Sequence, residues 1–193
     1  MSNKVFEDTE RPVREKFQQL MEQGKPSGLE ELIDQLQALI TEDPDFLEPY
    51  LVLDEIYTET GKTDKAAEVV EQAFSRALHL ITDDQGNWPD EIPWGVIENR
   101  HIVRAILHKA ISEWEQRNWQ DALDLLRLLL MTNPNDNVAA RYYILAIRMG
   151  FTFKGFEDRF NKGGYYDSEL NEWFDEHVNR FPDEFEWWLK YEF

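Results

Sequence analysis

Histidine and carboxylate side chains are the groups through which this chain could carry out acid–base or metal chemistry. Its four histidines are His79, His101, His108 and His177. His101 and His108 are seven positions apart, which corresponds to ~10 Å along a helix axis at about 1.5 Å per residue. One metal ion does not easily bind both across that distance. We therefore expect surface or packing histidines and no metal site.

The short motifs that usually carry catalysis or cofactor binding are missing from the sequence. It contains no HExxH, no GxSxG and no glycine-rich phosphate loop. The absence of cysteine excludes disulfides, thiolate catalysis and cysteine-bound zinc. The stretch 83–87, DDQGN, lacks the alternating oxygens and closing glutamate of a calcium loop. We expect no cofactor, and the remaining catalytic hypothesis is a hydrolase that uses His108 with Glu115 or Glu59.

Composition indicates an acidic globular protein. The 193 residues include 42% hydrophobic and 13% aromatic residues, enough for a core. Lysine and arginine number 20 against 39 acidic residues, giving a formal charge of −19. This field repels phosphate backbones, so we expect no nucleic-acid partner and favour a basic protein partner or simple solubility.

Two further patterns bear on localisation. The first five residues, MSNKV, lack the apolar core of a signal peptide. The most apolar run, LLRLLLM at 125–131, contains an arginine and is far shorter than a membrane span. We expect a cytoplasmic protein with no membrane partner.

Apolar residues recur at three- and four-residue steps along most of the chain, which is typical of amphipathic helices. Ser27 and Glu30 have the spacing of a capping box at one helix start. No stretch alternates long enough to predict a strand, so the chain is expected to be all-α. The expected helices are 13–22, 29–40, 48–59, 64–81, 101–116, 119–132, one ending at 149, 168–180 and 182–193.

The spacing of aromatic and small residues repeats along the chain. With Leu47 as position 1, positions 4, 7, 11, 15, 20 and 27 are Tyr50, Leu53, Tyr57, Gly61, Ala66 and Ala73. With Val103 as position 1, positions 4, 8, 20 and 32 are Ile106, Ala110, Ala122 and Pro134. This pattern resembles the tetratricopeptide repeat, a helix–turn–helix unit of 34 residues. The runs PWGVIENRHIVRA and NPNDN also resemble a block in bacterial proteins of this repeat class.

The resemblance implies one domain, 1–193, built as an α-solenoid with capping helices at its C-terminal end. Its parts are N-terminal helices (1–44), a first repeat (47–81), an inserted loop (82–100), a second repeat (101–134), and a partial repeat with an aromatic C-terminal cap (135–193). Ala66 and Ala122 are 56 residues apart rather than 34, so the loop is an insertion of about 22 residues.

The segment 122–131 is apolar on nearly every side, so another element must cover it. The aromatic segment FPDEFEWWLKYEF at 181–193 is the candidate for that cover. Its alternative roles are a homodimer contact and insertion into the groove of the solenoid.

The resemblance also implies a concave binding groove made by the first helix of each repeat. In this chain, such positions place arginines beside aromatic residues, a frequent composition of interaction hot spots. The expected partner-binding residues are Glu55, Glu59, Arg104, His108, Ile111, Trp114, Glu115, Arg141, Tyr142 and Arg148.

The function implied is that of a noncatalytic adaptor, which holds a peptide or helix of another protein in this groove. One alternative is an acidic decoy that engages a basic protein with its whole surface, and the other is the hydrolase described above. A decoy's association would weaken steeply with salt.

Overall fold

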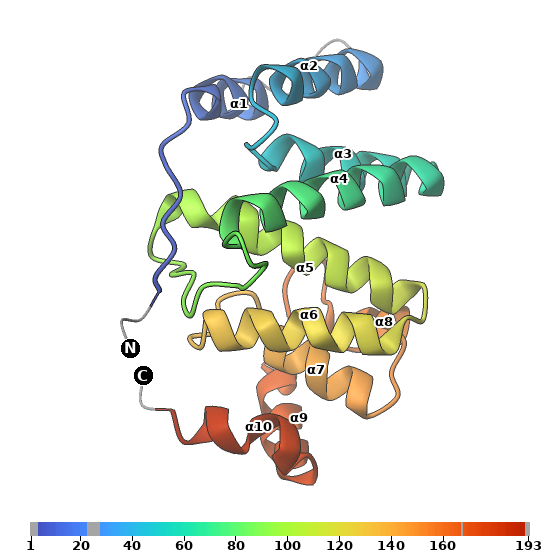
Figure 1. The fold of residues 1–193 in the computed structure, drawn as a ribbon. Coiled ribbons are helices and arrows are strands. Elements are labelled where there is room, and N and C mark those ends of the chain that lie inside the picture. Colours follow the sequence, from blue (N-terminus) through green and yellow to red (C-terminus); the bar gives the residue numbers. More distant parts are fainter. Residues whose placement is uncertain (1–3, 23–27, 167, 192–193) are drawn as a thin grey trace. The chain divides into compact units, whose positions relative to one another are not determined.

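The computed structural model describes residues 4–22, 28–166 and 168–191, and its regular elements are all helices (Figure 1). Extended pairing in this part of the chain is limited to two isolated bridges, Val5 with Glu91 and Asn161 with Tyr166. The all-α prediction is confirmed. The elements are α1 (Val13–Glu22), α2 (Leu29–Glu42), α3 (Glu48–Glu59), α4 (Thr63–Ile81), η1 (Ile97–Asn99), α5 (Arg100–Glu115), α6 (Trp119–Thr132), α7 (Ala140–Arg148), α8 (Phe153–Phe160), α9 (Glu169–His177), η2 (Val178–Arg180) and α10 (Pro182–Leu189).

Most helix boundaries agree with the sequence patterns, but α8 was not predicted. It has only eight residues and contains Gly155, a poor helix former, although Phe153, Phe156 and Phe160 share one face. Thr152 nevertheless caps it, because its hydroxyl accepts a hydrogen bond from the Gly155 amide at 3.1 Å. The expected helix cap at Ser27 lies outside the described residues.

Close contacts divide the chain into two compact units, an N-terminal unit (residues 1–109) and a C-terminal unit (residues 110–193). In the N-terminal unit, α3 packs closely on α4, α2 packs on α3, and α1 packs on α2. Ala66 and Ala73 of α4 are buried. Their small side chains allow close helix approach, as the spacing predicted.

The core of the C-terminal unit is leucine-rich on one side and aromatic on the other. α6 packs on α7, and α7 packs on α9. Leu126 and Leu129 are buried in α6, while Phe156 and Phe160 are fully buried in α8. Phe185 of α10 is fully buried and contacts Phe174 edge-on, with ring centroids 5.4 Å apart. The C-terminal aromatics thus contribute to the core of their own unit.

Three turns between successive helices are built alike. Gly61, Arg117 and Gly150 follow α3, α5 and α7 and have φ values of 70°, 67° and 82°. The amide of the residue that follows each of them donates to the carbonyl five residues earlier. In such a helix ending, a residue in the left-handed conformation turns the chain so that free carbonyls of the last turn receive hydrogen bonds. These bonds are Lys62 to Tyr57 at 2.8 Å, Asn118 to Glu113 at 2.9 Å and Phe151 to Ala146 at 2.9 Å.

The N-terminal segment pairs with the inserted loop. The Asp90 amide donates to the Lys4 carbonyl and the Phe6 amide donates to the Glu91 carbonyl, both at 2.9 Å. Asn99, fully buried, donates to the Phe6 carbonyl at 3.0 Å and accepts from the Asp8 amide at 2.9 Å. The first described residues are thereby fixed against the loop.

Candidate functional site

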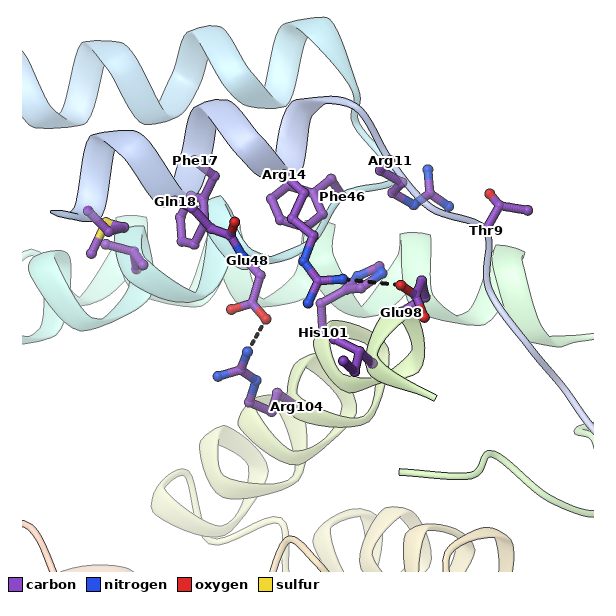
Figure 2. Close-up of a pocket in the computed structure, with 13 residues that line it drawn as sticks. Thr9, Arg11, Arg14, Phe17, Gln18, Phe46, Glu48, Glu98, His101 and Arg104 are labelled. Atoms are coloured by element: carbon purple, nitrogen blue, oxygen red, sulfur yellow. Dashed lines mark hydrogen bonds and ion pairs between the residues drawn. The ribbon is translucent and has the colours of Figure 1, made fainter. Parts of the chain in front are cut away.

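A cleft of about 340 Å³ opens in the N-terminal unit, beside the start of α5 (Figure 2). Its walls come from the N-terminal segment, α1, α3, η1 and α5. This volume lies at the lower end of the range for ligand-binding pockets. The lining residues are Thr9, Arg11, Arg14, Phe17, Gln18, Met21, Phe46, Glu48, Val52, Ile97, Glu98, His101 and Arg104.

The base of the cleft is a closed network of charges. Arg11 binds both carboxylate oxygens of Asp8 at 2.9 Å and also contacts Asp43 at 3.1 Å. Burial raises the pKa of Asp8, but hydrogen bonds from His101 and Arg11 outweigh it and lower the pKa to about 2. Asp8 therefore stays ionised, and the network holds the N-terminal segment against α5.

Hydrogen bonding fixes the tautomer of His101. The Leu47 amide donates to His101 Nδ1 at 3.2 Å, so the ring proton is on Nε2, which donates to Asp8 at 2.9 Å. The ring is buried, with an exposed fraction of 4%. Both ring nitrogens are engaged, which makes His101 a structural residue rather than a general base.

Two ion pairs at the rim are more exposed than the network at the base. Arg14 contacts Glu98 at 3.3 Å, and Arg104 contacts Glu48, as Figure 2 shows. The Arg104 side chain is 43% exposed, whereas that of Glu48 is 16% exposed. The Arg104 side chain is therefore the more accessible member of this pair, although its Nε atom is buried.

Apolar side chains and one free amide complete the cleft. Met21 and Ile97 are 46% and 47% exposed, so apolar surface is accessible to solvent there. The Gln18 amide has no hydrogen-bond partner among the described residues. Exposed apolar groups beside guanidinium, carboxylate and amide groups can hold a short amphipathic segment by burial and hydrogen bonding together.

Several sequence-predicted residues lie in the N-terminal unit. Arg104 lines the cleft. Glu55 and Glu59 on α3 are exposed and are not among its lining residues. His108 Nδ1 contacts Asp54 at 2.7 Å, so its observed carboxylate partner is not Glu59.

The other predicted residues lie in the C-terminal unit. The three that most resembled a binding hot spot contact other groups of the same unit. Trp114 is 1% exposed, and its indole donates to the Phe151 carbonyl at 2.9 Å. Tyr142 is 7% exposed and hydrogen-bonds Asn171. Arg141 contacts Asp136 at 2.7 Å. The remaining three are Arg148, which pairs with Asp183 and Glu184, Ile111, which is half-buried, and Glu115, which is exposed.

Sequence reasoning missed most of the cleft. Arg14, Gln18 and Met21 come from α1, where the repeat pattern is too degenerate to assign groove positions. Ile97 and Glu98 come from the inserted loop, which has no counterpart in the repeat. The available signal was the spacing of Arg11, Arg14, Phe17 and Met21, at three- and four-residue steps, in a chain with few basic residues.

Comparison with known proteins gives no family: no family model matches this chain, and no curated protein or solved structure matches it either. Among the described residues, no group of three or more histidine, aspartate or glutamate side chains is placed to hold a metal ion. None of the described helices has the length and apolar character needed to cross a bilayer.

Proposed function

We propose that this protein is a noncatalytic interaction module and that its N-terminal unit binds a short segment of another protein in the cleft. The observation that carries this proposal is the origin of the cleft walls. α1, α3 and α5 are the first helices of successive helix pairs, and each contributes side chains to the same opening. In helical repeat proteins, such helices line the concave binding face.

The proposal includes a tetratricopeptide-like arrangement of these helix pairs. Its support is the recurrence of the left-handed turn at Gly61, Arg117 and Gly150, the last two 33 residues apart. The unpredicted α8 then becomes the second helix of the pair that begins with α7. Glu48, Val52 and Arg104 line the cleft and lie on first helices of repeats, which the resemblance assigns to the concave face.

Site-specific crosslinking tests the proposed binding face. A photoreactive amino acid at Gln18 should capture a protein partner from native extract, whereas the same group at the exposed Gln72 of α4 should not. Adding Arg104→Glu should reduce the Gln18 adduct at least fivefold.

A matched substitution controls for a general effect of charge. Arg76 is 46% exposed, close to the 43% of Arg104, and has one carboxylate contact, to Asp45 at 3.4 Å. Arg76→Glu should leave the Gln18 adduct intact. Equal capture from both positions, or equal loss with both arginine variants, would contradict binding in the cleft.

The net charge of −19 favours a second candidate, in which the whole surface engages a basic protein. Ionic strength separates the two. Association through the whole surface should fall steeply between 50 and 500 mM salt, on the order of the Debye screening of exposed charges, while association within the cleft should largely persist.

A further inference from the structure

A second cleft, of about 260 Å³, lies wholly within the C-terminal unit. α6, α7 and α10 form it. Its apolar lining consists of Leu130 and Met131 from α6, Ile144 from α7 and Trp187 from α10. It shares no residue with the cleft of the N-terminal unit, so the two can be tested separately.

The position of α10 is fixed by its own contacts. The buried Glu184 accepts hydrogen bonds from Arg127 at 2.9 and 2.5 Å and also contacts Arg148. The Trp188 indole donates to the Pro134 carbonyl at 2.8 Å. None of these hydrogen bonds involves Trp187, and the cleft is preformed.

Two large apolar side chains of this cleft are exposed. Met131 is 58% exposed and Trp187 is 41% exposed, although both lie beside an apolar interior. Methionine adapts to partners of different shape, and tryptophan is enriched among residues that dominate binding energy. This exposure indicates an interaction surface more than an incomplete core.

The charges around this pair favour a basic partner. Arg127 and Arg148 both contact Glu184 and are only 33% and 26% exposed. Asp124 contacts Arg127 at 2.9 Å and Asp183 contacts Arg148 at 2.7 Å, but these two carboxylates are 55% and 62% exposed. The exposed Lys190 is paired with Glu186 at 2.5 Å. Asp124, Asp183 and Glu184 thus place three carboxylates against the two guanidinium groups, and the more exposed charges beside Met131 and Trp187 are negative.

The same charges disfavour two other occupants. A second copy of this chain would bring another net charge of −19 and the same two carboxylates against this surface. An anionic lipid surface would be repelled in the same way.

Helical spacing places these groups on shared faces. Asp124, Arg127 and Met131 follow one another at three- and four-residue steps along α6, and Asp183 and Trp187 are four residues apart on α10. Each helix therefore presents a carboxylate one or two turns from an exposed apolar side chain.

We propose that the surface formed by Asp124, Met131, Asp183 and Trp187 binds a basic amphipathic helix of another protein. An apolar side chain of that helix enters between Met131 and Trp187, and its lysines or arginines face Asp124 and Asp183. This second docking surface goes beyond the proposed function of the N-terminal unit.

Titration of the full chain with model peptides tests this inference. The probe is a labelled peptide of leucine and lysine arranged as an amphipathic helix, measured by fluorescence anisotropy at 150 mM salt. A scrambled peptide of the same composition, without an apolar face, should bind at least tenfold more weakly. A leucine–glutamate peptide of the same pattern should not bind measurably.

Variants then locate the binding. Trp187→Ala and Met131→Lys should each weaken the amphipathic basic peptide at least fivefold. Tyr165→Ala removes an aromatic ring that is 67% exposed in the same unit but outside the cleft, and binding should stay within twofold. Circular dichroism of each variant should match the parent protein.

Several outcomes would overturn the inference. They are equal binding of the scrambled peptide, unchanged binding by both cleft variants, or equal loss with Tyr165→Ala. Sedimentation that shows self-association abolished by Trp187→Ala would identify a second copy as the occupant instead. None of these results bears on crosslinking at Gln18.

Discussion

In the C-terminal unit, Arg127 and Arg148 converge on the buried carboxylate of Glu184, whereas in the N-terminal unit Arg14 and Arg104 each contact one carboxylate at the edge of a cleft. The first pair joins α6 and α7 to α10. In the second pair, the Arg104 side chain is 43% exposed, the largest exposed fraction of the four arginines. Arginine therefore joins helices in one unit, whereas Arg104 is accessible for binding in the other. The role of the arginine depends on whether its carboxylate partner is buried, as Glu184 is, or lies at the rim of a cleft.

The sharpest test of this comparison concerns tryptophan. Trp114 contacts Tyr143 and Phe156 with ring centroids 6.0 Å apart in each case, and is almost fully buried. Trp114→Ala should lower the free energy of unfolding by about 3–5 kcal/mol, as for other buried aromatic truncations. Urea denaturation measures this loss.

The matched control is Trp187→Ala, at a tryptophan that is 41% exposed. Its effect on stability should be about 1 kcal/mol or less, because little apolar surface is uncovered. Similar losses for the two variants would break the distinction between the buried and the exposed tryptophan.

Removal of the Glu184 carboxylate, which Arg127 and Arg148 share, should have the next largest effect on the free energy of unfolding. Burial raises the pKa of Glu184, but hydrogen bonds from Arg127 and Arg148 outweigh it and leave the pKa lowered. Glu184→Ala leaves two guanidinium groups without that partner and should destabilise the C-terminal unit by about 2 kcal/mol. Glu98→Ala, at the rim of the first cleft, should change the free energy of unfolding by about 0.5 kcal/mol or less. An equal effect of the two would contradict the comparison.

Acid should affect the N-terminal unit through Asp8. The folded-state pKa of about 2 lies below the ordinary value of 3.8, so the ionised form is the one that stabilises the fold. This contribution is complete above about pH 4 and is lost as the pH falls towards 2. Urea midpoints recorded from pH 5 to pH 2.5 should therefore decline.

Asp8→Asn provides the reference for that titration. It should lower stability at neutral pH and flatten the decline in acid, with hydrogen exchange locating the change in residues 1–109. A decline of the same slope in both proteins would exclude Asp8 as its source.

The smallest effect on stability is expected at the rim of the first cleft. Arg104→Ala removes a single contact from a side chain that is 43% exposed, and should change the free energy of unfolding by about 0.5 kcal/mol or less. Arg76→Ala should match it. A loss of more than about 2 kcal/mol in the free energy of unfolding for Arg104→Ala, but not for Arg76→Ala, would show that Arg104 stabilises the fold as Arg127 and Arg148 do.

Helical periodicity was sufficient to predict most of the helices. The predicted limits of the helix from Glu48 to Glu59 agree with α3, because its repeat residues and its stop at Gly61 are local features. α8 was not predicted because its aromatic side chains pack against α9, in which Trp173 contacts Phe160 with ring centroids 5.0 Å apart. Local sequence does not contain that contact.

The candidate site was harder to predict than the fold. The arginine and aromatic residues that looked most like a hot spot, Arg141 and Tyr142, are engaged by Asp136 and Asn171. These partners lie five and 29 positions away, so spacing on one helix did not show that the groups were already satisfied. Conversely, the cleft needs a loop and α1, whose positions depend on tertiary packing.

The pairing of the N-terminal segment with the inserted loop has a practical consequence for engineering. Lys4 and Asp90 are 86 positions apart, yet each supplies backbone hydrogen bonds that the other segment lacks alone. Trimming the loop to shorten the protein would remove these bonds and leave the N-terminal segment held by the contact of Asp8 with His101. Grafting the loop elsewhere would require carrying residues 4–6 along, because they supply its hydrogen-bond partners.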